Sequence, residues 1–325
     1  MIQNVTTGSL VPFTLDAMLA KIPSILDLGI DLYSTALEQV IDSSNITPDI
    51  WVDIANIIGD NYLAFDGFVV LHGSDTMAYT ASALSFMLHS LAKPVILTGS
   101  QLPIGLARSD ARENLITSLS IAAMQVNGIP VINEVCIFFE DQLFRGNRTH
   151  KFNSENFDAF QSINYPVLAD AGVHIKIHTE HILAKPRGDF QLLTTLKTNI
   201  AVLKLLPGLN ASIYADFFIA QKMEGVILET YGSGNGPTDE TFLKSIARMN
   251  DYGMVILNVT QCRGGSVDMG KYVTGQSLAK AGVVSGKDIT VEAAMVKMMH
   301  VLGSTTDFSE RKLLMENNLN GELTE

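Results

Sequence analysis

The residues best suited to chemistry stand in one short segment, Gly73-Ser74-Asp75-Thr76. Ser74, Asp75 and Thr76 place two hydroxyl groups and a carboxylate within three consecutive residues. A serine hydroxyl acts as a nucleophile only when a neighbouring group takes its proton. A helix N-cap explains one polar residue at such a turn, but it does not require three. The segment therefore favours a site in which a hydroxyl works beside a carboxylate.

Lys151, in the segment RGNRTHK, is a candidate for the base that such a hydroxyl needs. A lysine whose pKa is lowered by burial can take a proton from a hydroxyl near neutral pH. Taken alone, Lys151 is more typical of a solvated loop charge. No Gly-x-Ser-x-Gly sequence surrounds Ser74, which argues against an ordinary serine hydrolase triad.

Two further polar segments carry weaker signals. Asp42-Ser43-Ser44 could contribute to a site, although it also suits a simple turn before a helix that begins at Thr47-Pro48. The Gly-rich loop 232–236 presents Asn235. That loop lacks both the Gly-x-Gly-x-x-Gly pattern and the Lys-Ser/Thr of a phosphate-binding loop, so nucleotide binding is weakly supported.

The histidines and cysteines do not suggest a metal or a disulfide framework. We expect His174, His178 and His181 to be solvated, because no Cys or carboxylate stands at a ligand-like spacing and His174 and His178 fall on the outer face of a strand. Cys136 and Cys262 each end or follow an apolar, strand-like run, so both are expected to be buried thiols. The sequence therefore predicts no metal site.

The composition restricts the class of partner. The chain has 325 residues, of which 47% are hydrophobic, and a formal net charge of −12. This charge disfavours binding to nucleic acid, which needs a basic face to neutralise phosphates. No apolar run approaches the roughly 20 residues that cross a bilayer, so we expect no membrane partner.

Buried strands, loops and helices alternate along the chain, which predicts an α/β fold with a mostly parallel sheet flanked by helices. Before residue 178, strands are expected at 68–71, 94–98, 134–139 and 174–178, with helices at 76–90 and 111–125, the second capped by Asp110. The turn at 73–76 then lies at the carboxyl end of a strand, where open α/β sheets bind ligands.

The pattern predicts two domains. Residues 1–178 form a larger N-terminal catalytic domain, residues 179–199 are a linker because periodicity weakens there, and residues 200–325 form a smaller C-terminal α/β domain. In the second domain, strands are expected at 225–228 and 254–259. Helices are expected at 238–250, with Thr238 or Asp239 near its cap, at 290–302 and at 309–319, the last closed by Gly321.

Together these segments resemble the bacterial type I (cytoplasmic) L-asparaginases of the asparaginase/glutaminase superfamily. The resemblance runs in family order from Asp42 to the C-terminus. It is carried by DSSNITPDIW, DGFVVLHGSDTMAYTASALSFML, KPVILTGSQLP, RGNRTHK, YGSGNGP, NVTQCRGGSVDMGKYVTG and NLNGELT. It implies hydrolysis of L-asparagine to L-aspartate and ammonia without a cofactor, and a cytoplasmic location.

The resemblance also implies roles for particular residues. Ser74, Lys151 and Asp75 match a hydroxyl–lysine–carboxylate triad, in which Asp75 would also bind the substrate's α-amino group. The family usually has Thr where this chain has Ser74. The substrate-binding positions would be Asp42, Ser43, Ser44, Ser100 and Asn235. Asn235 would complete the site of a second copy, which implies a homodimer or a tetramer.

The opening residues depart from the family pattern. Members begin with a strand and a Thr-Gly-Gly-Thr-Ile-Gly loop whose first Thr is the principal nucleophile, whereas Met1 aligns just after that loop. Thr6 and Thr7 are polar and close by, and Ser9 or Leu10 stands where members carry a lid tyrosine. We expect the sequence to begin at an internal methionine, because loss of a central strand would leave buried backbone groups unpaired at about 1–3 kcal/mol each.

Two other functions stay open at this point. If the family's nucleophile is truly absent, the chain would be a catalytically degenerate asparagine-binding or regulatory protein. It could also be a glutaminase or a broad amidase, because one methylene of substrate length changes binding by only about 1–3 kcal/mol. L-Glutamine is therefore a possible second substrate.

Overall fold

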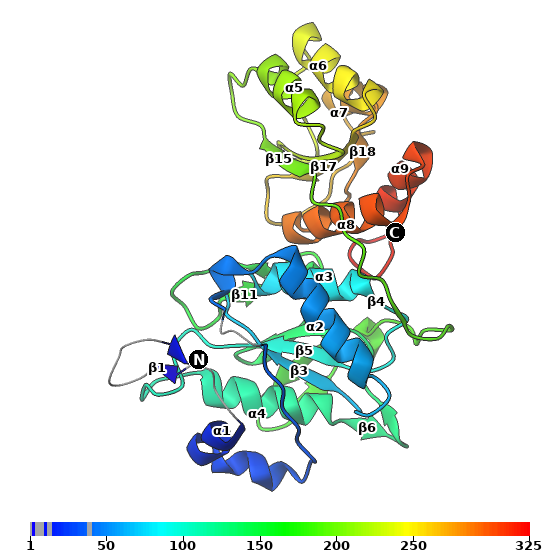
Figure 1. The fold of residues 1–325 in the computed structure, drawn as a ribbon. Helices are drawn as coiled ribbons and strands as arrows, with labels where there is room; N and C mark the ends of the chain where they lie inside the picture. Colours follow the sequence, from blue (N-terminus) through cyan, green and yellow to red (C-terminus); the bar gives the residue numbers. More distant parts are fainter. Residues whose placement is uncertain (1, 4–9, 12–14, 38–40) are drawn as a thin grey trace. The chain divides into compact units, whose positions relative to one another are not determined.

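The computed structural model describes residues 2–3, 10–11, 15–37 and 41–325. These residues divide into two compact units. Unit 1 comprises Met1–Leu84, Leu88–Ser162 and Pro166–Leu192, and unit 2 comprises Ser85–Met87, Ile163–Tyr165 and Leu193–Glu325. Unit 1 contains a mixed sheet with three parallel strands and unit 2 contains a parallel sheet, and helices cover both sheets (Figure 1), so the predicted α/β class is confirmed.

Unit 1 is built on a six-stranded sheet in the order β13-β12-β9-β8-β5-β3. The strands β3, β5 and β8 are parallel, and the remaining strands continue the sheet as antiparallel neighbours. Their bounds are β3 Phe68–Leu71, β5 Val95–Thr98, β8 Val135–Phe139, β9 Gln142–Arg145, β12 Ala169–Ala171 and β13 Ile175–Ile177. Figure 1 shows helices α2 (Pro48–Asn61) and α3 (Met77–Met87) on one face of this sheet and α4 (Ala111–Ala122) on the other.

The register of β3 and β5 brings two polar loops to one edge of the sheet. Phe68 pairs with Val95 and Leu71 pairs with Thr98, so the two parallel strands end together. The loops that follow them, one with Ser74 and one with Ser100, therefore leave the same carboxyl edge.

Burial of β3 differs from the prediction. The sequence predicted a strand covered on both faces, but Leu71 is 52% exposed and the other three residues are half-buried. Among the strands in the described ranges, β3 pairs only with β5. The fully buried strands of the parallel part are β5 and β8.

The remaining elements of unit 1 are short. They are β1 Ile2–Gln3, β2 Leu10–Val11, α1 Leu15–Lys21, η1 Pro23–Leu28, η2 Ser43–Asn45, β4 Leu88–His89, β6 Gln125–Val126, β7 Ile129–Pro130, η3 Gly146–Arg148, β10 His150–Lys151, β11 Phe160–Gln161, η4 Thr179–His181 and β14 Gln191–Leu192. The predicted helix 76–90 therefore ends earlier, and its last residues form β4 instead. The segment expected to be a linker contains η4 and β14, and β14 pairs with β4.

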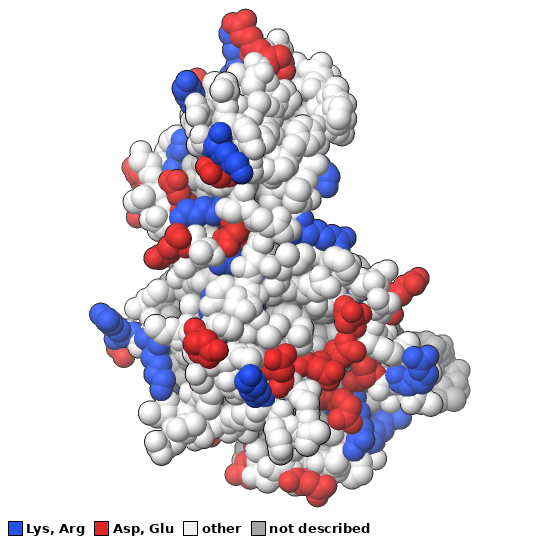
Figure 2. Space-filling model, turned by 180° about the vertical axis from the view of Figure 1, so that it is seen from behind, with Lys and Arg blue, Asp and Glu red and all other residues white. Residues whose placement is uncertain are grey.

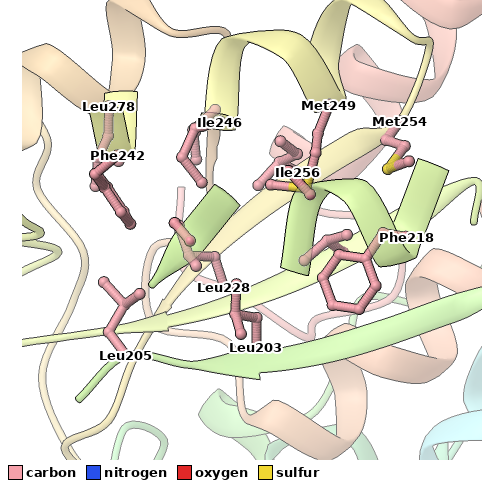
Figure 3. Packing of buried hydrophobic residues seen from close by; sticks show 14 residues of the cluster. Leu203, Leu205, Phe218, Leu228, Phe242, Ile246, Met249, Met254, Ile256 and Leu278 are labelled. Atoms are coloured by element: carbon pink, nitrogen blue, oxygen red, sulfur yellow. The ribbon is translucent and has the colours of Figure 1, made fainter. Parts of the chain in front are cut away.

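Unit 2 contains a parallel sheet in the order β15-β16-β17-β18. Helices α5, α6 and α7 cover one face, and α8 and α9 cover the other (Figure 1). The bounds are β15 Ile200–Lys204, β16 Gly225–Thr230, β17 Val255–Thr260, β18 Val284–Ser285, α5 Ala211–Ala220, α6 Glu240–Asp251, α7 Val273–Lys280, α8 Val291–Ser304 and α9 Phe308–Glu316. Figure 3 shows side chains of α5 and α6, among them Phe218 and Ile246, that pack on the strands with Leu203 and Leu228.

Helix ends in unit 2 follow the predicted caps only in part. Asp239, one of two candidate cap residues beside Thr238, accepts a hydrogen bond from Phe242 N at 2.9 Å and so caps α6. Helix α9 was expected to reach 319 and stop at Gly321. It ends at Glu316, and Gly321 instead occupies the following turn with φ +81°. A positive φ at that turn explains why glycine stands there.

Two predictions about side-chain exposure were wrong. Cys136 is buried in β8, but Cys262 is exposed because it stands two residues beyond the end of β17. The expectation that the histidines are solvated holds for His174 and fails for His178, whose Nε2 lies 2.8 Å from Asp170 Oδ2. That carboxylate comes from the neighbouring strand β12, so the sequence spacing did not indicate it.

The surface carries both signs of charge. On the face drawn in Figure 2, the described Lys and Arg side chains do not form one large patch, and several carboxylates lie together. Among the described residues, no helix is long and apolar enough to cross a membrane.

Candidate active site

The turn that follows β3 does not use its polar residues to cap α3. Thr76 holds the N-cap position, but no side chain there accepts a hydrogen bond from the first helical turn. Its hydroxyl instead donates to Ser43 O at 2.7 Å. Capping, the simplest explanation for Ser74, Asp75 and Thr76, therefore does not account for them.

Lys151 meets this turn from a separate hairpin. It lies on β10, which pairs antiparallel with β11. Its Nζ lies 2.8 Å from Ser74 Oγ and 2.6 Å from Asp75 Oδ1. The Lys151 side chain is 17% exposed, whereas that of Asp75 is 63% exposed. The amino group of Lys151 is thus largely shielded from solvent, whereas the Asp75 carboxylate is exposed.

The Ser74 hydroxyl also contacts Gln101, a residue that the sequence analysis did not select. Ser74 Oγ lies 3.3 Å from Gln101 Oε1, and Gln101 Nε2 donates to Asn156 O at 2.8 Å. The Asp110 carboxylate accepts the Gln101 backbone N–H at 2.9 Å, so it fixes this loop instead of capping α4 with its side chain. The position of Gln101, directly after the predicted Ser100, was the available signal.

Residues 42–44 pack against the turn 73–76. The Asp42 carboxylate accepts hydrogen bonds from Ser44 N at 2.9 Å and Ser44 Oγ at 2.7 Å. These bonds lower the pKa of the Asp42 carboxyl, with the backbone bond as the larger cause. Ser43 is buried against Gly73, where an added Cβ would lie 2.5 Å from Ser43 Oγ. Gly73 therefore allows the two loops to touch.

A chain of hydrogen bonds that starts at buried Trp51 leads to the backbone of the turn. Trp51 Nε1 donates to Thr80 Oγ1 at 3.0 Å, and Thr80 Oγ1 lies 2.9 Å from His72 Nε2. His72 Nδ1 lies 2.7 Å from Gly73 O. A carbonyl only accepts, so Nδ1 carries the proton and Nε2 accepts from Thr80. Burial lowers the pKa of His72 and favours this neutral form, although the bond to Gly73 O opposes the shift.

The structure thus brings most of the predicted residues to one edge of the sheet in unit 1. Ser74, Asp75 and Lys151 are in direct contact. Asn235 belongs to unit 2, where its Oδ1 accepts from Thr274 Oγ1 at 2.6 Å. Thr6, Thr7 and Ser9 lie outside the described residues, and the side chain of Leu10 is not described.

The arrangement suits chemistry at an electrophilic carbonyl carbon. The Ser74 hydroxyl contacts the amino group of Lys151, and the two can exchange a proton. The Asp75 carboxylate balances the charge of Lys151 when its amino group is protonated. The backbone N–H groups at the start of α3 lie beside this group and lack side-chain caps. Such groups, with the positive end of the helix dipole, favour negative charge.

Comparison with known proteins points to one family. The model "Asparaginase, N-terminal" matches residues 1–183, and "Glutaminase/Asparaginase C-terminal domain" matches residues 199–315. L-asparaginase 1 of Escherichia coli K12 is 44% identical over 305 residues, covering 93% of this chain and 86% of that protein.

Other relatives carry a related name or a different one. The crystal structure of L-asparaginase I from Vibrio cholerae superposes with a TM-score of 0.90 and 40% identity, covering 98% of this chain and 95% of that one. A mouse protein named 60 kDa lysophospholipase is 43% identical over 290 residues, covering 88% of this chain but 50% of that protein.

Proposed function

Because this chain belongs to the asparaginase family, we propose that it hydrolyses the side-chain amide of L-asparagine to give L-aspartate and ammonia. The contact of Lys151 Nζ with both Ser74 Oγ and Asp75 Oδ1 is the observation that carries the proposal. It assembles a hydroxyl, an amine and a carboxylate at the carboxyl edge of a parallel sheet, where α/β proteins bind ligands.

Each of the three residues has a distinct task in this proposal. Lys151, held by Asp75, exchanges a proton with Ser74, and Ser74 passes it between Lys151 and the attacking hydroxyl or water. Attack on the amide carbon gives a tetrahedral oxyanion, whose charge backbone N–H groups stabilise. The C–N bond then breaks, and the amide nitrogen takes up the transferred proton and leaves as ammonia. Where a hydroxyl attacked, the product is an ester, which water then hydrolyses by the same kind of attack to free the hydroxyl and L-aspartate. By either route, water supplies the oxygen of the new carboxylate.

The substrate's own charges would be met by the surrounding loops. The side chain of Asp75 is 63% exposed, so its carboxylate can bind the α-amino group while it still contacts Lys151. The loop 42–44 offers hydroxyl groups and a carboxylate to the α-amino and α-carboxylate groups. Gln101 contacts Ser74, and Gln101 and the preceding residue Ser100 would contact the side-chain amide. No metal or organic cofactor is needed for these steps.

Substrate turnover tests this function directly. The purified chain is incubated separately with L-asparagine and L-glutamine, and amino acid product and ammonia are both measured. We expect aspartate and ammonia in equal amounts from asparagine and slower release from glutamine. Binding of asparagine without release of either product would instead support an asparagine-binding or regulatory protein.

We also propose that Asn235 acts on the site of a second copy in a cytoplasmic homodimer or tetramer. The loop that carries it is well held, since Asn258 Nδ2 donates to Gly234 O at 3.0 Å. Lys151→Met and Asn235→Ala chains, each expected to be inactive alone, are unfolded, mixed and refolded together. Activity should recover in dimers with one chain of each kind, because one of their two sites then has both Lys151 and the partner's Asn235. Lack of recovery from refolded mixed oligomers would contradict sharing of Asn235.

A further inference from the structure

Three side chains with metal-binding atoms lie together just after β13. They are His178, Glu180 and His181, and one ligand atom from each lies within 4.8 Å of the other two. His178 is the N-cap residue of η4, the single turn that contains the other two. In a 3-10 turn the side chains at positions i and i+3 lie one above the other, which brings His178 and His181 together, and Glu180 lies between them in the chain.

Hydrogen bonds set the tautomer of each histidine in its neutral form. His178 Nε2 lies 2.8 Å from Asp170 Oδ2, and the carboxylate accepts a hydrogen bond from the Nε2–H group. His178 Nδ1 therefore carries the lone pair, and it lies 3.9 Å from Glu180 Oε1. His181 Nδ1 lies 3.1 Å from Val167 O, so its proton is on Nδ1 and its lone pair on Nε2. Histidines that bind metals in proteins are oriented by the same two kinds of partner, a carboxylate or a backbone carbonyl.

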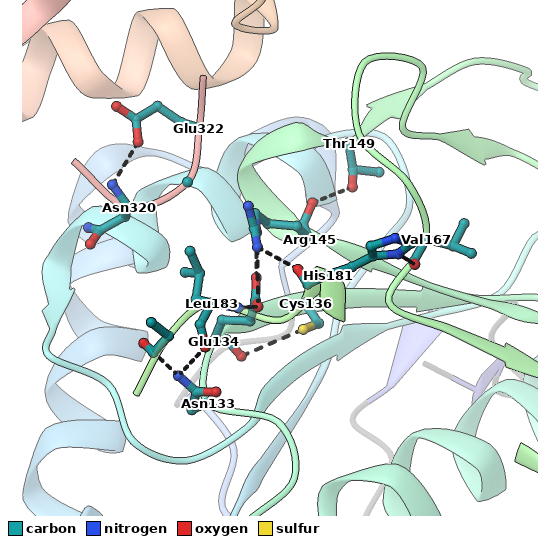
Figure 4. A network of polar contacts seen from close by, with 12 residues as sticks. Asn133, Glu134, Cys136, Arg145, Thr149, Val167, His181, Leu183, Asn320 and Glu322 are labelled. Atoms are coloured by element: carbon teal, nitrogen blue, oxygen red, sulfur yellow. Dashed lines mark hydrogen bonds and ion pairs between the residues drawn. The ribbon is translucent and has the colours of Figure 1, made fainter. Parts of the chain in front are cut away.

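The backbone of this turn is fixed by a buried ion pair. Arg145 Nη2 donates to His181 O at 2.9 Å, while Arg145 Nε lies 2.6 Å from Glu134 Oε2. Glu134 Oε1 accepts from Leu183 N at 2.8 Å, just past the turn (Figure 4). Arg145 and Glu134 are almost fully buried. The histidine backbone is therefore positioned before any ligand binds.

We propose that His178 Nδ1, His181 Nε2 and the Glu180 carboxylate bind a divalent transition metal ion such as Zn²⁺, with Asp170 orienting His178. Two imidazoles and a carboxylate suit Zn²⁺, whose fourth position water can fill. Atoms bound to one tetrahedral Zn²⁺ lie roughly 3.4 Å apart. Glu180 is 67% exposed, so its side chain can turn to close the site. Mg²⁺ prefers oxygen ligands and would bind weakly.

This site is separate from the proposed catalytic residues and does not depend on asparagine hydrolysis. An ion bound there would hold the turn η4 in its folded conformation. It would therefore raise the thermal stability of unit 1, because a ligand that binds only the folded chain favours folding. Metal binding and thermal stability can thus be measured without an activity assay.

The test is titration of the full, untagged chain, freed of metal with a chelator, with ZnCl₂ alone. Calorimetry and the melting temperature follow the binding. We expect saturable binding that is lost in Glu180→Ala and His181→Ala, and about 10–100-fold weaker in Asp170→Asn. His174→Ala is the matched control, because His174 is exposed on the same hairpin outside the cluster. It should bind Zn²⁺ like the wild type.

Different results would overturn the proposal. Absence of saturable Zn²⁺ binding in the wild type is one such result. Equal losses in His174→Ala and His181→Ala would show surface chelation instead of a built site, and an unchanged affinity in Asp170→Asn would remove the orienting role of that carboxylate. Glu180→Ala keeps the test valid even if a histidine variant folds poorly, since the side chain of Glu180 is largely exposed.

Discussion

The Nζ atom of Lys151 lies 2.8 Å from the Oγ atom of Ser74, although 77 positions separate the two residues in the chain. The contact forms because β10 and the turn after β3 come to the same place in unit 1. Through this contact, Lys151 and the turn after β3 together form a group of side chains that can exchange protons.

Asp75→Asn should weaken binding of ligands that carry an α-amino group. The substitution removes the negative charge that would meet that group and keeps the side-chain shape. We expect at least about tenfold weaker binding of L-aspartate, the non-consumed product, or roughly 1.4 kcal/mol. Ligand-induced thermal stabilisation measures it, with Asp27→Asn, an exposed carboxylate elsewhere in unit 1, as the control. An unchanged shift would remove Asp75 from ligand binding.

Gly73→Ala should damage the site through packing alone. The new Cβ would lie 2.5 Å from Ser43 Oγ and 2.7 Å from Ser43 Cβ, so the two loops must separate. We expect a loss of about 1–3 kcal/mol in stability and of roughly 100-fold in turnover. The matched control is Gly105→Ala, where no atom lies within 4 Å of the added Cβ. Normal turnover in Gly73→Ala would show that the contact with Ser43 is not required.

His72 should make stability depend on pH. Its pKa is lowered from 6.5, mainly by burial, so the unfolded chain binds more protons than the folded chain once the pH drops below about 6.5. His72 therefore does not reduce the free energy of unfolding above that pH, and the free energy of unfolding decreases as the pH falls toward the folded-state pKa. His72→Gln should lose less stability than the wild type between about pH 7.5 and 5.5. Urea unfolding measures this, and exposed His89→Gln should follow the wild type.

Lys297→Met should destabilise unit 2 strongly. Lys297 and Glu322 are both fully buried and their charged atoms lie 2.7 Å apart, so removing the lysine leaves an unpaired buried carboxylate. We expect a loss of about 3–5 kcal/mol in the free energy of unfolding. Lys244→Met breaks an exposed pair with Glu240 and should cost less than about 1 kcal/mol. Similar losses in the two variants would contradict a role for burial.

The sequence was most informative where local pattern decides the structure. The strand 68–71, the polar turn and the start of the helix after it were placed correctly, because strand and helix periodicity and turn residues act over short distances. The cap of α6 was narrowed to Thr238 or Asp239 for the same reason, and Asp239 is the residue that forms it. The resemblance selected Lys151 as a partner of Ser74, which spacing alone could not do.

Features that depend on distant segments were missed. Gln101 contacts Ser74 only because β3 and β5 end together. The pairing of His178 with Asp170 depends on the β12–β13 hairpin, and the exposure of Cys262 depends on where β17 ends. None of these leaves a periodic or compositional signal near the residue concerned.

The most direct test of the account is turnover of saturating L-asparagine by Lys151→Met beside the wild type. The side chains are similar in length, but methionine cannot exchange a proton with Ser74 or pair with Asp75. We predict a fall of at least about 100-fold in kcat, with the exposed Lys185→Met variant unchanged. Wild-type turnover by a folded Lys151→Met chain would contradict the proposed role of the Ser74–Lys151–Asp75 group.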